Sequence, residues 1–299
     1  MLNTLAFSSL DRVSSALQSM YQMRMNRIHK FKPKVQIFSE VGPFVIKTVT
    51  NIDELKASLM LRYQVFHREF MGKPRMVGLD IDAFDSVCDH LVIIEKKTGQ
   101  VVGTYRMNCS LFSEKFYSGK EFNLKRIMDK PYVKLELGRA CIHRDYRRGS
   151  VISLLWRGIA EYMNASNSQV LFGCGSVKTK NPREAALLYR YFFEDKRISP
   201  DFFAPPTLPF TMPNLDLWIQ NFKSPLTDSE RAEAEAMIPT LLRTYLKIGA
   251  KIGGEPAWDE EFQCIDFLTI VDREDLNKAL WKKYKLNAEP SSDSSSFAS

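Results

Sequence analysis

The sequence lacks the features that mark membrane-spanning and secreted proteins. No apolar run reaches about 18 residues, so no segment is expected to cross a bilayer as a helix. The N-terminus has neither the charged start nor the uninterrupted apolar stretch of a secretion signal. These absences favour a cytoplasmic protein.

Cysteine and histidine are sparse and occur singly. The five cysteines include no C-x-x-C pair, which argues against a disulfide framework and indicates a reducing compartment. The four histidines show no recurring ligand spacing, so no metal is expected. The motif CDH at 88–90 is not a catalytic relay, because neighbouring residues of a strand point to opposite sides. In GCGS at 173–176, two glycines allow a close backbone approach, and a structural role for Cys174 is favoured.

Basic residues, by contrast, are in excess. The chain has 42 Lys and Arg against 35 Asp and Glu, a net charge of +7, and 44% hydrophobic residues over 299 positions. This size and composition can bury one large core or two modest ones, and we expect one elaborated domain with appendages. The positive charge favours an acidic partner: nucleic acid, anionic lipid headgroups or an acidic carrier protein.

Periodicity and turn signals predict alternating strands and helices. Strands are expected at 44–49, 90–95, 100–108, 132–143, 169–174 and 265–271. Helices are expected at 51–66 and 150–164. A further helix begins at 181, another begins at 227, and the helix after that one ends at 246. Asn51, Pro182 and the capping box TDSE at 227–230 mark helix starts. This order predicts an α/β fold with a mixed sheet, helices on both faces and a C-terminal extension.

Both ends of the chain look like appendages to a main domain at 35–287. In residues 1–34, apolar positions recur at helical spacing and basic positions follow: Leu10, Val13, Leu17 and Met20, then Arg24, Arg27, Lys30, Lys32 and Lys34. This segment is either a helix packed on the domain or an amphipathic helix lying on an anionic membrane surface. Residues 288–299 are polar and serine-rich, and they are expected to be disordered.

The predicted strand at 132–143, YVKLELGRACIH, poses a geometrical problem. Glu136 and Arg139 lie three apart, so a regular strand would point them to opposite faces. A β-bulge near Gly138 would reset the alternation, free a backbone N–H and open the sheet. The resulting carboxylate, guanidinium and amide donor suit acyl transfer from a thioester to an amine. A cross-strand salt bridge is the alternative interpretation.

The loop DYRRGS at 145–150 lies between that strand and the next helix. Backbone N–H groups at the helix start, together with Arg147 and Arg148, predict an anion site for a phosphate or a pantetheine phosphate. A solvated basic turn would have the same composition.

Several segments in the same order resemble the ornithine lipid N-acyltransferases, also called hemolysin-like, of the GNAT superfamily. They run from about residue 45 to 271: LRYQVFHREF, FDSVCDHLVII, VVGTYRM, LELGRACIH, DYRRGSVISLLWRGIAEY, LFGCGSV and the late IPTLLRTYLKIGAKIGGEPAWDEEFQCIDFLTIV. The resemblance implies a GNAT-type splayed sheet. It also implies transfer of a 3-hydroxyacyl chain from acyl carrier protein to the α-amine of an amino acid, typically ornithine. No role in nucleic-acid binding is expected.

The resemblance also suggests roles for particular residues. More distantly, six charged positions match those that build the acceptor site of acyl-homoserine-lactone synthases: Arg62, Asp85, Asp89, Arg106, Glu136 and Arg139. Glu136 is the candidate base, Arg139 with Arg106 would hold the acceptor carboxylate, and Asp85 with Asp89 would attract its ammonium groups. The acyl chain would lie near Trp156 and Phe172.

The donor is inferred from a departure in the phosphate loop. Relatives that use acetyl-CoA typically show R-G-x-G-x-G/A, whereas RRGSVI has Arg148, Ser150 and Ile152 at those positions. A pyrophosphate cradle is therefore disfavoured, and Arg147, Arg148, Gly149 and Ser150 are expected to bind the phosphopantetheine of acyl carrier protein rather than CoA. No tightly bound cofactor is expected.

Two other functions remain open at this stage. One is an acyl-homoserine-lactone synthase, which the charge pattern permits. The other is a membrane-active hemolysin-like protein, for which only the N-terminal 34 residues could supply the amphipathic element. A lipid product would also suit peripheral contact with the inner membrane surface.

Overall fold

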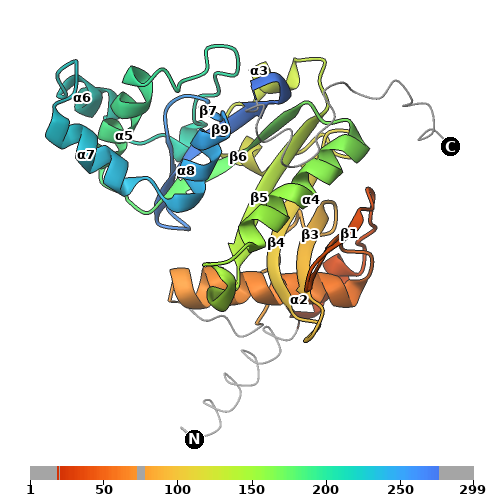
Figure 1. Cartoon of the computed structure of the whole chain (residues 1–299). Coiled ribbons are helices and arrows are strands. Elements are labelled where there is room, and N and C mark those ends of the chain that lie inside the picture. Colours follow the sequence, from red (N-terminus) through yellow and green to blue (C-terminus); the bar gives the residue numbers. More distant parts are fainter. Residues whose placement is uncertain (1–18, 20, 73–77, 276–299) are drawn as a thin grey trace, which may run out of the picture. The chain divides into compact units, whose positions relative to one another are not determined.

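The predicted alternation of strands and helices is present in the computed structural model, which describes residues 19, 21–72 and 78–275 (Figure 1). Hydrogen bonds join the strands in the order β1-β2-β3-β4-β5-β6-β9-β7, and β8 pairs with β9. The β5–β6 pair is parallel, whereas β1–β2, β2–β3 and β6–β9 are antiparallel. An open mixed sheet flanked by helices confirms the predicted fold class.

The strands are β1 (Phe38–Val41), β2 (Phe44–Thr48), β3 (Asp89–Glu95), β4 (Val101–Cys109), β5 (Lys134–Ile142), β6 (Val170–Val177), β7 (Lys251–Ile252), β8 (Ala257–Asp259) and β9 (Cys264–Asp272). The helices are α2 (Ile52–Arg62), α3 (Lys125–Met128), α4 (Val151–Ser166), α5 (Pro182–Glu194), α6 (Leu215–Gln220), α7 (Asp228–Met237) and α8 (Thr240–Lys247). The sequence did not predict β1, β7, β8, α3 and α6, which have six residues or fewer each. Short elements provide too few residues for a periodic pattern.

The chain divides into two compact units whose boundaries fall inside β4, β5 and α4. Unit 1 comprises Met1–Arg106 and Arg139–Gly158, and unit 2 comprises Met107–Gly138 and Ile159–Ser299. The predicted domain limits at 34/35 and 287/288 stay predictions, and the second lies outside the described residues.

Unit 1 has an apolar core under α2. Leu55 and Leu59 of α2 are fully buried in this core, as is Val92 of β3. Asn51 caps α2 as predicted, since its side chain accepts a hydrogen bond from the Glu54 amide at 2.9 Å. Beyond Arg62 the chain continues as an eight-residue π-helix, Tyr63–Phe70.

The segment before the first strand packs on the same core. Residues 21–28 are helical, and Met25, Ile28 and Phe31 are buried in unit 1. This agrees with the prediction of a packed helix for that part of the segment. The apolar positions from Leu10 to Met20 lie outside the described residues.

Unit 2 contains two apolar clusters, one between the sheet and α3 and one around α5. The predicted helix starts are confirmed: Asn181 and Pro182 begin α5, and Thr227 with Glu230 forms a complete capping box on α7. The segment 200–213 contains five prolines, and its Phe202 and Met212 are buried in unit 2. Within 19, 21–72 and 78–275, no helix has the length and apolarity needed to cross a membrane.

Candidate functional site

Strand β5 loses its regular geometry between Glu136 and Arg139. Its parallel pairing with β6 runs only from Lys134 opposite Val170 to Glu136 opposite Phe172. Arg139 has a φ of 53°, in the left-handed region that non-glycine residues rarely adopt. Gly138 has no positive φ. The irregularity expected near Gly138 therefore lies one residue later, at Arg139.

A glycine of β6 accommodates the end of the regular pairing. A Cβ atom at Gly173 would lie 2.2 Å from the carbonyl oxygen of Leu137, so only glycine fits against β5 there. The close backbone approach predicted for GCGS is thus confirmed, and the approaching group is the neighbouring strand.

Glu136 is held in a buried, fully specified position within unit 2. It is 4% exposed and accepts three hydrogen bonds. The amides of Tyr117 and Ser118 donate at 2.9 and 2.7 Å, and the Ser118 hydroxyl donates at 2.7 Å. These donors come from the turn of 3-10 helix at Tyr117–Lys120. The carboxylate is therefore oriented by groups from one neighbouring turn.

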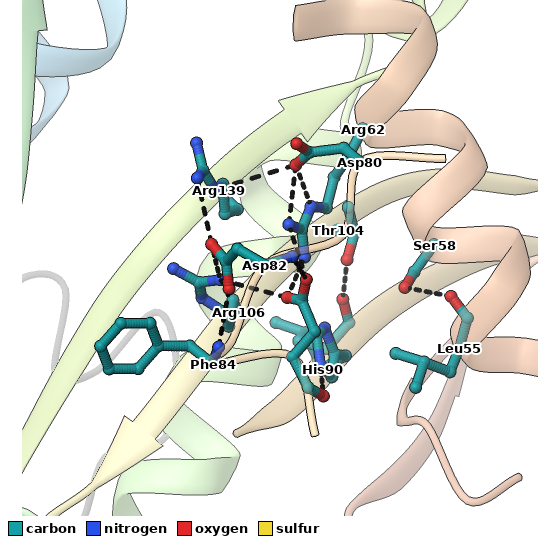
Figure 2. A network of polar contacts seen from close by, with 12 residues as sticks. Leu55, Ser58, Arg62, Asp80, Asp82, Phe84, His90, Thr104, Arg106 and Arg139 are labelled. Carbon is teal, nitrogen blue, oxygen red and sulfur yellow. Dashed lines mark hydrogen bonds and ion pairs between the residues drawn. The ribbon is translucent and has the colours of Figure 1, made fainter. Parts of the chain in front are cut away.

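A second group of charged residues forms a network in unit 1 (Figure 2). Arg62, at the end of α2, is fully buried and donates to two carboxylates. Its Nε and Nη2 atoms lie 2.9 and 2.7 Å from Asp80 Oδ2, and its Nη1 lies 2.6 Å from Asp85 Oδ1. Burial alone would raise the pKa of Asp80, but the charge of Arg62 and a hydrogen bond from His67 hold it well below its usual range.

The network extends to the guanidinium groups of β4 and β5. Arg106 Nη1 lies 2.7 Å from both carboxylate oxygens of Asp82 and 3.1 Å from Asp85 Oδ1. Arg139 Nη2 donates to Asp82 Oδ2 at 3.1 Å. Burial opposes the charge of Asp82, yet Arg106 and Arg139 lower the pKa of this carboxyl. Three guanidinium groups thus face three carboxylates, and their charges balance (Figure 2).

Exposure differs across this balanced network. Arg62 and Asp85 have fully buried side chains, whereas the side chains of Arg139 and Asp82 are 13% and 20% exposed. Arg139 also lies over the Phe66 ring of the π-helix, at 5.9 Å from its centroid. The Arg139–Asp82 pair is therefore the most exposed edge of the network. Arg62 and Asp85 instead fix the segment 80–85 against α2.

The structure places the other predicted residues in three further environments. Asp89 is buried and accepts from the amides of Lys34 and Val35 at 2.9 and 3.0 Å, so it anchors the entry to unit 1. Trp156 and Phe172 are buried, at 7% and 2% exposure, in the cores of units 1 and 2 respectively. Their assignment to the acyl chain stays a prediction.

The predicted phosphate-binding residues lie together at the start of α4. Arg147, Arg148, Gly149 and Ser150 are all exposed, between a turn of 3-10 helix at Arg144–Tyr146 and the first residue of α4. Arg147 donates to the Ile142 carbonyl at 3.1 Å and pairs with Glu69 at 2.7 Å.

Sequence reasoning missed several residues that the structure brings into these groups. Asp80 and Asp82 stand with Asp85 in LDIDAFD, and this recurrence of aspartate among apolar residues was an available signal. Ser118 and Glu121 had no comparable signal, since their partners Glu136 and Cys174 are distant in the chain.

The chain was compared with known protein families, proteins and structures. The profile described as "Acetyltransferase (GNAT) domain" matches residues 61–157, which include the charged network, β5 and the start of α4. Residues 61–157 are therefore similar to a GNAT acetyltransferase domain, and the open mixed sheet agrees with that similarity.

Two similar proteins from two bacteria have the same name. L-ornithine N(alpha)-acyltransferase of Brucella abortus is 28% identical over 84% of this chain and 92% of its own, and that of Rhizobium meliloti is 27% identical over 80% and 83%. The solved acyl-homoserine lactone synthase LasI has a TM-score of 0.45 at 15% identity, covering 80% of this chain and 95% of its own.

Proposed function

We propose that this protein transfers an acyl chain from acyl carrier protein to the α-amine of ornithine, as a step of aminolipid synthesis. The observation that carries the proposal is the buried Glu136 carboxylate at the point where β5 and β6 stop pairing. The ornithine acyltransferase relatives, matched over most of the chain, support the same reaction.

Glu136 is proposed as the base that prepares the amine. An aliphatic amine with a pKa of roughly 8 to 10 is mostly protonated at neutral pH and cannot attack a thioester until it loses a proton. Hydrogen bonds from Tyr117 and Ser118 fix the carboxylate, which limits the reorganisation needed when it accepts that proton.

Arg139 and Asp82 are proposed to bind the acceptor amino acid. An amino acid carries one carboxylate and at least one ammonium group, so it can replace an existing ion pair by two new ones. Arg139 would take the carboxylate and Asp82 an ammonium group, at the exposed edge of the network. Arg62, Asp85 and Arg106 would support this pair from behind, and Asp89 would act only through the fold of unit 1.

Acyl carrier protein is proposed as the donor. The net charge of +7 and the exposed Arg147 and Arg148 suit an acidic carrier with a single pantetheine phosphate. The bulkier residues at 148 and 150 make the loop less suited to the pyrophosphate of CoA.

Purified protein supplied with 3-hydroxyacyl carrier protein and ornithine tests the proposal. We expect an N-acylated ornithine by mass spectrometry. Glu136→Gln should lower kcat by about 10²- to 10⁴-fold with little change in KM for ornithine. Glu114→Gln is the matched control, because Glu114 is an exposed glutamate of the same unit. Wild-type activity in Glu136→Gln would remove Glu136 from the mechanism, and absence of any product would refute the reaction.

A further inference from the structure

The polar contacts that begin at Glu136 continue beyond Ser118. A row of polar side chains continues from it through unit 2, which we call the polar row: Ser118, Cys174, Glu121 and Asp266. The Ser118 hydroxyl donates to Glu136 at 2.7 Å, and the Cys174 thiol lies 3.6 Å from Ser118 Oγ. All of these groups come from elements within one unit, namely β5, β6, β9 and the turn at 117–121.

The row continues from Cys174 to β9. Cys174 Sγ lies 3.5 Å from Glu121 Oε2. This sulfur and one carboxylate oxygen from each of Glu121 and Asp266 lie within 4.8 Å of one another. Both carboxyl groups are buried, at 2% and 3% exposure. Asp266 also accepts from Ser176 at 2.5 Å. A continuous path of groups that can give and accept protons therefore leads away from Glu136.

The far end of the row is buried and lies beside residues that border an exposed turn. Asp259 and Cys264 have atoms within 4.8 Å of Asp266 and of each other. Both flank the turn 260–263, in which Glu260, Glu261 and Gln263 are exposed. A proton on Asp266 can thus pass to Asp259, which directly precedes the exposed turn.

The chemistry of amide formation leaves one proton to remove. An ammonium group loses two protons when it becomes an amide nitrogen. One ends on the sulfur, because the C–S bond breaks and the thiolate becomes a thiol. The other is taken by Glu136 before attack, and it must leave that buried carboxyl before the next turnover.

We propose that the polar row is a relay that carries this proton from Glu136 to the turn at 260–263. The inference rests on the proposed function, since it takes Glu136 to be the base. Glu136 gives its proton to the Ser118 oxygen as Ser118 gives its own to Cys174. Cys174 then passes one to Glu121, and Glu121 passes one to Asp266. Asp266 releases a proton to Asp259, which gives it to water at the turn 260–263. Every intermediate group ends with as many protons as it began with.

The acid–base properties of the row indicate which groups hold a proton at neutral pH. Burial, reinforced by the charges of Asp266 and Asp259, raises the pKa of Glu121 to about 9, so it holds a proton at neutral pH. Burial raises the pKa of Asp266 to about 6, despite the hydrogen bond from Ser176. Burial and the neighbouring acids raise the pKa of the Cys174 thiol well above its usual value. At neutral pH Glu121 therefore has a proton to give and Asp266 is ionised and able to accept one, although this transfer runs against the difference between their pKa values.

Buffer dependence of the rate tests the relay in the full-length enzyme with acyl carrier protein and ornithine. In weak buffer at neutral pH, Glu121→Gln and Cys174→Ala should each lower kcat by about 10²-fold, without a change in KM for ornithine. Added imidazole should restore much of the rate, because a small base takes the proton from Glu136 directly. Cys174→Ser keeps a donor and acceptor in place and should retain most of the activity.

Cys109→Ala is the matched control, since Cys109 is a buried thiol of unit 2 whose Sγ lies 4.0 Å from Ser168 Oγ. Wild-type rates in both relay variants, or losses that imidazole does not restore, would overturn the relay. Failure of the wild-type enzyme to acylate ornithine would instead refute the proposed function. Should Cys174→Ala fail to fold, Glu121→Gln decides the question.

Infrared spectroscopy gives a readout without turnover. At neutral pH the carbonyl band of a protonated carboxyl should be present in the wild type and lost in Glu121→Gln. Its persistence in that variant would remove Glu121 from the path.

Discussion

Replacing Gly173 by alanine should disrupt the point at which β5 leaves β6. The new Cβ would lie 2.2 Å from the Leu137 carbonyl oxygen, about 1.2 Å short of the 3.4 Å at which ordinary contact begins. The obstructing atom belongs to the backbone, so no side-chain rotation can relieve the overlap. Overpacking costs about 1–3 kcal/mol, and we expect a loss near the upper end.

Thermal unfolding followed by circular dichroism measures this loss. For a unit of this size, about 3 kcal/mol corresponds to a fall in Tm of roughly 6–12 °C. Gly138→Ala is the matched control, because a Cβ there meets nothing within 4 Å and the backbone has no positive φ. That variant should have the wild-type Tm, or its free energy of unfolding should rise by up to about 1 kcal/mol.

Equal melting temperatures for the two variants would refute the reasoning about the strand junction. The clash should also disturb Glu136, which directly precedes Leu137, and so lower kcat more than Gly138→Ala does. A destabilised Gly173→Ala with wild-type kcat would separate the fold of the junction from its catalytic use.

Four further predictions concern charge. Arg62→Met should lower the free energy of unfolding by about 3–5 kcal/mol in urea titrations, because two buried aspartates lose their partner; an unchanged urea midpoint would contradict this. Burial lowers the pKa of His90 to about 4. The stability that its neutral form contributes above pH 6.5 should therefore be lost as the pH falls toward 4. In His90→Gln, Tm should fall less steeply over this pH range. The raised pKa of Glu121 has the opposite sign, since stability present below pH 4.5 is lost as the pH rises toward 9. Glu121→Gln should therefore gain Tm relative to the wild type between pH 5 and 9, and a constant difference would speak against a buried acid. Finally, Arg148→Glu should raise KM for acyl carrier protein and weaken the dependence of this KM on salt, while KM for ornithine stays fixed. If the wild-type KM for acyl carrier protein did not change with salt, that would argue against electrostatic docking.

The local chemistry of the sequence determined much of the fold. Asn51, Pro182 and the pair Thr227 and Glu230 mark helix starts that the structure confirms. Each signal depends on interactions within about four residues, so it can be predicted from the sequence alone. The longer strands were predicted for the same reason, because their apolar pattern is local.

The position of the strand irregularity was only partly predictable. The spacing of Glu136 and Arg139 indicated that the strand could not be regular, and glycine was the natural place for a distortion. The structure instead gives the positive φ to Arg139, whose guanidinium pairs with Asp82 and lies over Phe66. Tertiary contacts of a charged side chain outweighed the local preference of glycine.

The polar groups around the base were decided by tertiary structure alone. Ser118, Cys174 and Asp266 lie in segments far apart in the chain, and each reaches its partner through the register of strands or the turn beside them. A one-residue shift of β6 against β9 would turn Cys174 or Asp266 to the other face of the sheet. The sequence could therefore suggest Glu136, whereas only the packed sheet shows where its proton can go.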